Sequence, residues 1–581
     1  MNSKRNAIRQ DVVLCFCAAV AEKLRAIEKI VGRLLSKAGF YVFTKRQYRD
    51  GSGVIRVRVS SAPVRAPVER IDYLFLLPGG LRPDIVNSIT SKTKVVGDVG
   101  TITRDSPKLR EREAVIAELP LAARMKELNC GAHEPEALAG VTAALLGLSV
   151  DSEGALWERR AEDSEVSALK TAFHLGHALG VEMDEGVLVA RYLRSNKKEI
   201  LMDAGTALSL GTATGGCNFV TSHSPFPGAL FDFYSDNALR FGAVVLRAED
   251  ERSALNMCIG AAYTGARGLL TTDGCFVNEV VETAALSETP LVVYAAPAEP
   301  APGAMFRFRY GELPHAVYAP VSVESAFALG ARAFATAEKF RTPVVLATDP
   351  YLWKIAYDVE PSLLDETGKK GKNVFEKLPG LVLDTRSKTR KDKYMEKLAA
   401  LLDDSLPPKL FGDPLYQTLI VSWGSLQETL LEALRVAETQ GRFDVKGVAV
   451  LSCEQLHPLP SQVETFLKQA RRLIFVEHDG RFARFVQAET GCAPTDIVSK
   501  QDEKPFAEKF LSENLFSVEE LVERLQNLFA PNEAASSETT SSSGKKEAVP
   551  PALPVLPIVA EFSALSALSS AAGERNGGES V

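Results

Sequence analysis

A run of three acidic residues, Glu249-Asp250-Glu251, stands where carboxylates are able to do chemistry. It follows the apolar segment Ala243–Leu246, which is typical of a buried strand, and precedes the helical pattern Ser253–Thr264. Parallel α/β sheets bind ligands at the carboxyl ends of their strands, so a carboxylate here is placed for acid–base work. The competing interpretation is that these residues only stabilise the start of the helix, where the helix dipole favours negative charge.

Other polar patterns carry weaker signals. His174 and His177 lie three positions apart on a predicted helix, but no cluster of cysteines or carboxylates completes a metal site. The stretch Gly211–Gly216 lacks the lysine that follows a Walker loop. Without a CxxC pair, the scattered cysteines predict neither an iron–sulfur cluster nor structural zinc in this chain, and they fit free thiols of a cytoplasmic protein. These are Cys15, Cys17, Cys130, Cys217, Cys258, Cys275, Cys453 and Cys492.

The chain has 581 residues, too many for one hydrophobic core, and we expect about three domains. It is 46% hydrophobic and 24% charged with a net charge of −7, which is an ordinary soluble composition and argues against nucleic-acid binding. The apolar run Val12–Val20 is far shorter than the ~20 residues of a membrane span. Lys4 and Arg5 precede it, as in a signal peptide. We favour a buried strand, Asp11–Cys17, because a long amphipathic helix, Ala21–Lys37, follows directly.

Alternating strand and helix patterns divide the chain into segments. Residues 1–190 alternate short apolar strands with helices, and residues 200–365 repeat helix-then-strand units with short connections. Such repeats predict a multidomain α/β protein whose parallel sheets are covered by helices on both faces. Residues 366–409 form a polar, lysine-rich connector, and residues 410–530 return to the strand–helix pattern. Residues 531–581 are rich in Ala, Ser, Thr, Pro and Gly, which predicts a disordered tail.

Several motifs in the second and third segments resemble one family. The stretch Arg247–Arg267 is followed at the family's spacing by Thr271-Thr-Asp-Gly274 and Asp349-Pro-Tyr-Leu352. Trp423-Gly-Ser425 and Leu456-His-Pro-Leu-Pro460 extend the match. These motifs resemble the α subunits of 2-oxoacid:ferredoxin oxidoreductases, closest to the 2-oxoglutarate type.

The first segment resembles the γ domain of the same family, through Gly39–Thr44 and Ile55–Ser60. The resemblance therefore implies a fused γ–α subunit. A γ-like α/β domain is followed by a transketolase-like, pyrimidine-binding domain for thiamine diphosphate, and then by a C-terminal α/β domain. The implied activity is oxidative decarboxylation of a 2-oxoacid to acyl-CoA, with coenzyme A as co-substrate and ferredoxin as electron acceptor.

The resemblance also implies a divided cofactor site. In this family a glutamate in a dry pocket hydrogen-bonds the pyrimidine ring of the cofactor. The resemblance implies that Glu249 is this glutamate and that Gly274 also contacts the cofactor. Asp250 and Glu251 are then ordinary carboxylates of the helix start. The chain has no Gly-Asp-Gly…Asn module for Mg²⁺ and diphosphate. We therefore expect the diphosphate half, Mg²⁺ and a [4Fe-4S] cluster on a separate β subunit, in a heterodimer or heterotetramer.

The sequence departs from the family pattern in two loops that bind ligands. The Gly-rich loop after the first strand of the γ domain is replaced by Cys17–Lys23, whose side chains hinder a phosphate from approaching the backbone. The family's substrate-binding Tyr-Pro-x-Thr-Pro loop reads His223–Pro227. Phe226 stands where the threonine belongs, and Ser224 takes its place only if the loop shifts.

The third departure concerns the arginine that holds the substrate carboxylate. The corresponding segment, Ala296–Gly303, has none; Arg307 and Arg309 follow it and are either substrate ligands or solvated loop charges. A pocket of lower polarity favours an apolar-tailed 2-oxoacid over 2-oxoglutarate. The alternative hypothesis is a degenerate structural or regulatory subunit without catalytic activity.

Overall fold

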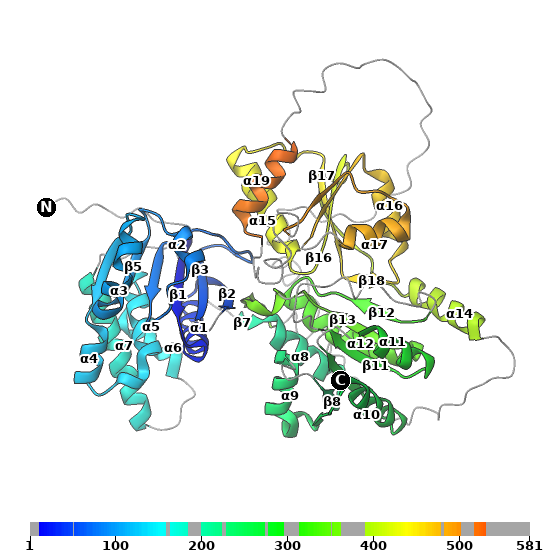
Figure 1. Cartoon of the computed structure of the whole chain (residues 1–581), viewed down its shortest axis with the longest axis horizontal. Helices are drawn as coiled ribbons and strands as arrows, with labels where there is room; N and C mark the ends of the chain where they lie inside the picture. Colours follow the sequence, from blue (N-terminus) through cyan, green and yellow to red (C-terminus); the bar gives the residue numbers. More distant parts are fainter. Residues whose placement is uncertain are drawn as a thin grey trace, which may run out of the picture. The chain divides into compact units, whose positions relative to one another are not determined.

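The computed structural model describes residues 11–49, 52–157, 163–183, 199–223, 228–272, 277–295, 313–349, 351–361, 390–477, 481–500 and 516–529. The chain divides into two compact units (Figure 1). Unit 1 comprises residues 1–204 and 353–366, and unit 2 comprises residues 205–352 and 367–581. Both contain strands paired in parallel and covered by helices, as the predicted α/β class requires.

Unit 1 is built on an eight-stranded sheet in the order β6-β5-β4-β1-β3-β2-β14-β7. β1, β4, β5 and β6 are parallel, whereas β3, β2, β14 and β7 continue the sheet through antiparallel pairs. The strands are β1 (Asp11–Ala18), β2 (Tyr41–Arg49), β3 (Ser52–Ser60), β4 (Tyr73–Leu76), β5 (Lys94–Asp98), β6 (Val115–Leu119), β7 (Ile200–Asp203) and β14 (Ile355–Val359). Thus Asp11–Ala18 forms a buried strand, as the favoured interpretation of the N-terminal apolar run predicts.

The helices of unit 1 include a closely packed pair, α5 and α7. A Cβ atom on Gly176 of α7 would lie 1.8 Å from the carbonyl oxygen of Ala137 on α5, so only glycine allows this approach. The helices are α1 (Ala21–Lys37), α2 (Pro83–Ser88), α3 (Val99–Arg110), α4 (Leu121–Glu127), α5 (Glu134–Leu145), α6 (Gly154–Trp157) and α7 (Asp163–Met183).

Strands β7 and β14 lie in the sheet of unit 1, although we expected residues 200–365 to form a domain of their own. The two strands pair with each other, and β14 also pairs with β2. Their partners are more than 150 residues away in sequence. The local pattern identified strand-forming segments but could not show which sheet they join.

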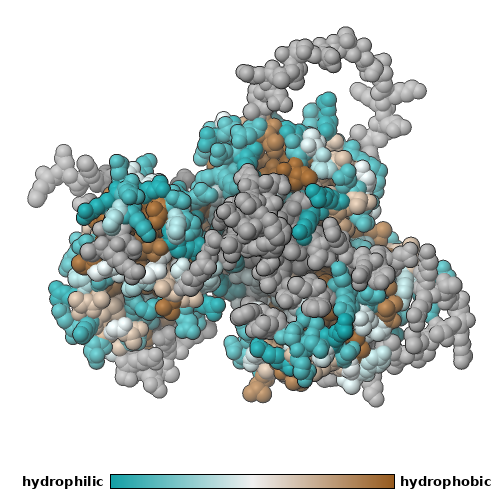
Figure 2. Space-filling view, viewed as in Figure 1, coloured by the Kyte–Doolittle hydropathy of each residue, from teal (hydrophilic) through white to brown (hydrophobic). Residues whose placement is uncertain are grey.

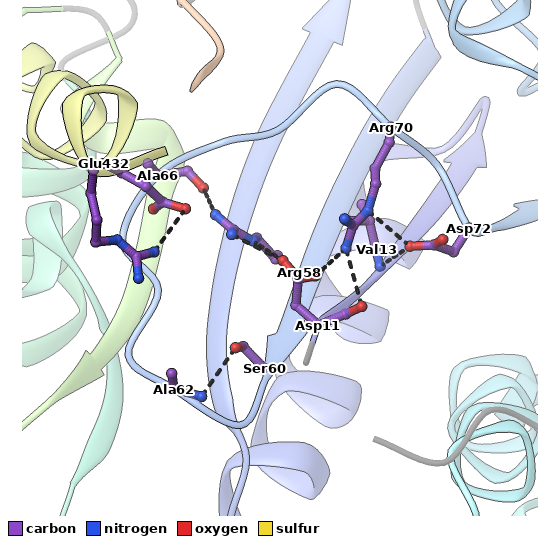
Figure 3. Close-up of polar contacts among 10 residues, drawn as sticks. Asp11, Val13, Arg58, Ser60, Ala62, Ala66, Arg70, Asp72 and Glu432 are labelled. Atoms are coloured by element: carbon purple, nitrogen blue, oxygen red, sulfur yellow. Dashed lines mark hydrogen bonds and ion pairs between the residues drawn. The ribbon is translucent and has the colours of Figure 1, made fainter. Parts of the chain in front are cut away.

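A polar network stabilises the start of β1 (Figure 3). Arg58 and Arg70 both bind the Asp11 carboxylate, and Arg70 also contacts Asp72, whose carboxylate accepts a hydrogen bond from the amide of Val13. Burial acts to raise the pKa of Asp11, but the hydrogen bonds and charges of Arg70 and Arg58 outweigh it and lower the pKa. The ionised carboxylate thus holds two segments together.

Unit 2 contains a seven-stranded sheet, called here the middle sheet, in the order β18-β12-β13-β11-β10-β8-β9. All pairs except β12–β18 are parallel. Its strands are β8 (Phe219–Ser222), β9 (Val244–Arg247), β10 (Gly268–Thr272), β11 (Leu291–Ala295), β12 (Ala316–Tyr318), β13 (Val344–Ala347) and β18 (Gln455–His457). Its helices are α8 (Ala204–Thr214), α9 (Gly228–Phe241), α10 (Glu251–Tyr263), α11 (Val277–Leu286) and α12 (Val323–Phe340).

Unit 2 also contains a five-stranded sheet, the C-terminal sheet, in the order β15-β17-β16-β19-β20. Its elements are β15 (Lys409–Gly412), β16 (Thr418–Trp423), α15 (Leu426–Gln440), β17 (Val448–Cys453), α16 (Ser461–Gln469), β19 (Arg472–Val476), α17 (Arg481–Thr490), β20 (Asp496–Val498) and α19 (Val518–Phe529), preceded by α14 (Arg390–Asp403). One hydrophobic core runs from the middle sheet into the C-terminal sheet, and β18 crosses between them. The predicted disordered tail lies outside the described residues.

The described surface is mostly polar. Hydrophilic residues cover much of the coloured face in Figure 2, with smaller apolar patches between them. No helix in the described ranges is long and apolar enough to cross a membrane.

Candidate functional site

The carboxyl ends of β8, β9, β10 and β11 lie side by side along one edge of the middle sheet, because these parallel strands pair in register. The acidic motif is the turn that connects β9 to α10 at this edge. Its position therefore agrees with the general location of ligand sites in parallel sheets.

The first two carboxylates of the motif face solvent. Glu249 is exposed. Asp250 is the N-cap of α10, and its Oδ1 accepts a hydrogen bond of 2.7 Å from the backbone amide of Ser253. This backbone hydrogen bond, together with that of the Ser253 side chain, lowers the pKa of Asp250. Asp250 thus has the capping role expected of it.

The third carboxylate, Glu251, is the buried one. Its side chain is only 5% exposed, and its Oε1 accepts a hydrogen bond of 2.5 Å from the hydroxyl of Thr272 at the end of β10. A carboxylate that activates a cofactor from a dry pocket needs such burial. In this chain Glu251 is buried in this way, whereas the predicted Glu249 is exposed.

A pattern in the sequence could have distinguished the two glutamates. The buried face of α10 consists of Glu251, Ala254, Leu255, Cys258 and Ala262, spaced as one side of a helix. Glu251 thus shares a stripe with apolar residues, whereas Glu249 precedes the helix. The other predicted site residues, Ser224, Phe226, Gly274, Arg307 and Arg309, lie outside the described residues.

Sequence comparisons match the same region. Residues 229–380 match the family described as "Pyruvate flavodoxin/ferredoxin oxidoreductase, thiamine diP-bdg". The chain is 28% identical to the 2-oxoglutarate synthase subunit KorA of Archaeoglobus fulgidus over 310 residues, covering 48% of this chain and 87% of that protein. It is 23% identical to the 2-oxoacid:ferredoxin oxidoreductase subunit alpha of a Sulfolobus species over 617 residues, covering 84% of this chain and 94% of the relative.

The chain is similar to the α subunits of 2-oxoacid:ferredoxin oxidoreductases. A solved structure of the 2-oxoglutarate:ferredoxin oxidoreductase from Magnetococcus marinus, with 2-oxoglutarate, coenzyme A and succinyl-CoA bound, superimposes with a TM-score of 0.73. The two share 17% sequence identity, and the match covers 89% of this chain and 99% of the other. The resemblance to oxidoreductase α subunits and the α/β fold predicted from the sequence are both confirmed.

Two motifs shared with these α subunits contact each other. The carboxylate of Asp349, after β13, accepts hydrogen bonds from the amide of Ser425 at 2.6 Å and from its hydroxyl at 2.9 Å. Gly424, at φ +66°, makes room for it, since a Cβ there would lie 2.4 Å from Asp349 Oδ2. The amides of Tyr351 and Leu352 also donate to Asp349. These motifs therefore connect the two sheets of unit 2.

The carboxylate of Glu477, directly after β19, is also structural. Glu477 is fully buried and accepts hydrogen bonds from the amides of Phe482 and Ala483 at 2.6 and 2.9 Å. Its carboxylate thus stabilises the first turn of α17, where the helix dipole favours negative charge.

In the γ-like region of unit 1, a neighbouring segment packs on the end of β1. The amide of Leu77 donates to the carbonyl of Cys17, and the amide of Ala19 donates to that of Pro78. A Cβ on Gly80 would lie 2.3 Å from the Cys17 backbone, so the Leu77–Gly80 segment packs directly against this strand end. A cavity of about 360 Å³ lies instead over the ends of β4, β5 and β6, and its walls are mainly apolar.

The two histidines of α7 have ordinary partners. His174 Nε2 lies 3.0 Å from a Glu153 carboxylate oxygen, and His177 Nε2 lies 2.9 Å from the carbonyl oxygen of Leu148. Within the described ranges, no three residues of the types His, Cys, Asp and Glu cluster closely enough to hold a metal ion.

Proposed function

We propose that this chain is the γ–α subunit of a 2-oxoacid:ferredoxin oxidoreductase and supplies the pyrimidine-binding half of a shared thiamine diphosphate site. In the reaction the 2-oxoacid loses its carboxylate as CO₂, the acyl group forms a thioester with coenzyme A, and two electrons pass to ferredoxin. The buried Glu251 in the matching domain is the observation that carries the proposal.

The residues at the edge of the middle sheet fit the pyrimidine half of this cofactor. Bound thiamine diphosphate supplies the carbon nucleophile for decarboxylation. Glu251 would supply the carboxyl group for its pyrimidine ring nitrogen, and the Thr272 hydroxyl, which donates to one carboxylate oxygen, would hold this side chain in place. We transfer to Glu251 the role that the sequence assigned to Glu249, because only Glu251 is shielded from water by its own chain.

A separate β subunit accounts for the missing diphosphate half. β9 is an edge strand, and its apolar side chains Val244 and Leu246 are 51% and 41% exposed. Leu239, on α9, is fully exposed. Exposed apolar edge strands are normally covered by another chain or element. We propose that the β subunit covers this edge and brings Mg²⁺, the diphosphate-binding residues and a [4Fe-4S] cluster to the site.

The second candidate function is a structural or regulatory subunit of the same family. One observation favours it: the segment Leu77–Gly80 packs directly on the end of β1, next to the place where the family's γ domain has its Gly-rich loop. The intact buried Glu251 favours catalysis, and a substrate assay decides between the two.

The proposed function is tested by reconstitution. Calorimetry should show weak binding of thiamine diphosphate and Mg²⁺ to the chain alone and tight binding once the β subunit is added. The complex should then reduce ferredoxin when a 2-oxoacid and coenzyme A are supplied. Tight, Mg²⁺-dependent binding by the chain alone would refute the divided site. A complex that binds the cofactor but turns over no 2-oxoacid would support the non-catalytic subunit.

A further inference from the structure

Four polar side chains form a row on one face of the middle sheet, at the strand ends. In the register, Arg247 of β9 is opposite Ser222 of β8, Ser222 is opposite Thr271 of β10, and Thr271 is opposite Tyr294 of β11. Partners in a parallel pair point to the same face, and successive residues alternate between faces. Thr271 therefore points away from the face on which Thr272 binds Glu251.

Helix α9 covers this second face at its first turn. The guanidinium of Arg247 lies 5.6 Å from the ring centre of Phe231, and a Cβ on Gly228, the first residue of α9, would lie 3.9 Å from the ring of Tyr294. Both contacts involve the N-terminal turn of a 14-residue helix. That end carries free amides and the positive end of the helix dipole, which favour an anion.

Thr271 is the residue that points to a ligand. Its side chain is 1% exposed, and its hydroxyl oxygen has no hydrogen-bond partner among the residues that the structure describes. Leaving a buried hydroxyl without a partner costs roughly 1–3 kcal/mol, so this hydroxyl calls for a partner, which a ligand or a water can supply. Arg247 is exposed, and its guanidinium lies over the ring of Phe231.

We propose that Arg247, the Thr271 hydroxyl and the first turn of α9 bind the carboxylate of the 2-oxoacid. This inference rests on the proposed function and names the substrate-binding residues that the family pattern lacks in this chain. Arg247 takes over the role of the arginine missing from residues 296–303, and Thr271 that of the threonine replaced by Phe226.

The arrangement also sets the substrate class. Thr271 and Thr272 are consecutive, so the substrate carboxylate and the cofactor-activating Glu251 lie on opposite faces of the same strand end. The row contains one cation, which matches one carboxylate. A second carboxylate, as in 2-oxoglutarate, finds no further positive charge in this row and is costly to bury. The site therefore selects monocarboxylic 2-oxoacids.

Ligand-observed NMR on the full-length chain tests the site without requiring turnover. The probes are 2-oxobutanoate, 2-oxoglutarate and 2-butanone, which carry one, two and no carboxylates. We expect 2-oxobutanoate to bind best and 2-butanone not to bind. Arg247→Ala should weaken 2-oxobutanoate binding about 10- to 100-fold, the range for a lost charge-assisted hydrogen bond. Thr271→Val, which removes the hydroxyl, should weaken 2-oxobutanoate binding about 5- to 10-fold. Thr271→Ser, which keeps the hydroxyl, should bind 2-oxobutanoate as the wild type does.

Arg240→Ala is the matched control, since Arg240 lies over Phe241 in the last turn of the same helix, at a ring distance of 5.9 Å. It should bind 2-oxobutanoate as the wild type does. Equal binding by Arg247→Ala and the wild type, equal binding of 2-butanone, or loss of binding only in Arg307→Ala or Arg309→Ala would overturn the inference. Arg247-dependent binding in a chain whose β complex has no turnover would support the site while refuting the proposed function.

Discussion

The middle and C-terminal sheets of unit 2 are built alike but differ at the carboxyl ends of their strands. In the C-terminal sheet the residues that follow β16 and β19 are engaged: Ser425 donates to Asp349, and Glu477 accepts from the amides of Phe482 and Ala483, although the buried hydroxyl of Ser422 on β16 has no partner among the described residues. In the middle sheet the hydroxyl of Thr271 has no partner among the described residues, and Glu251 accepts one described hydrogen bond, from Thr272. The buried carboxylates near the strand ends thus differ: Asp349 and Glu477 each accept several hydrogen bonds and join segments of the chain, whereas the one hydrogen bond described for Glu251 leaves it capacity for a ligand.

The largest expected effect on stability comes from removing the joint at the C-terminal sheet. Asp349→Ala leaves the amides of Ser425, Tyr351 and Leu352 without an acceptor. We expect a loss of about 3–5 kcal/mol, in the range for breaking a buried charged network. Hydrogen exchange of residues 418–440, followed by mass spectrometry, should rise sharply.

Asp413→Ala is the control for that substitution. Asp413 accepts hydrogen bonds from the amides of Leu415 and Gly447 but is only partly buried. It should cost about 1 kcal/mol. Equal exchange in the two variants would show that the Asp349 contact is no more than a surface turn and would weaken the contrast between the sheets.

A smaller effect is expected where β18 joins the middle sheet to the C-terminal sheet. His315 and His457 stack with ring centres 4.1 Å apart. Burial lowers the pKa of His315 to about 4, against a smaller opposing effect of its hydrogen bond with Leu313, and burial together with His315 lowers the pKa of His457 well below its usual range. Both rings are therefore neutral in the folded protein near pH 7.

The direction of the pH effect follows from these lowered pKa values. Between pH 6.5 and about 4, His315 is protonated in the unfolded chain but neutral in the folded protein, because folding lowers its pKa. The free energy of unfolding is therefore highest above pH 6.5 and falls as the pH drops through this interval. Denaturant unfolding should show a loss of roughly 2–3 kcal/mol over this interval. His315→Phe keeps a stacked ring and should flatten the dependence. An unchanged pH slope in this variant would mean that other groups cause the loss.

Local pattern predicted much of this fold, because apolar periodicity marks helices and strands directly. The predicted helix Ala21–Lys37 coincides with α1. Pairing between distant segments was not predictable: nothing local indicates that β7 and β14 complete the sheet of unit 1 or that β18 joins β12. The positions of loop side chains are the hardest to predict from sequence. Ser224, Phe226, Arg307 and Arg309 lie in loops, whose paths are not specified by any apolar periodicity.

The position of the acidic motif at a strand end was predicted, whereas the role of its glutamates stays a prediction. The sequence favoured Glu249 through its family pattern, whereas the helical stripe of Ala254, Leu255 and Cys258 includes Glu251, and burial leads us to propose Glu251 instead. Thr271 and Arg247 were not recognised as a pair, because only the strand register brings them onto one face.

One measurement tests the central claim most directly: turnover of the reconstituted complex with Glu251→Gln and with Glu249→Gln. Both substitutions preserve size and remove the carboxyl group, so each serves as the control for the other. If the buried glutamate activates the cofactor, Glu251→Gln should lower kcat by a factor on the order of 10²–10⁴, and Glu249→Gln should retain activity within a few-fold. A large loss in Glu249→Gln with near-normal turnover in Glu251→Gln would contradict the account and return the catalytic role to the exposed residue.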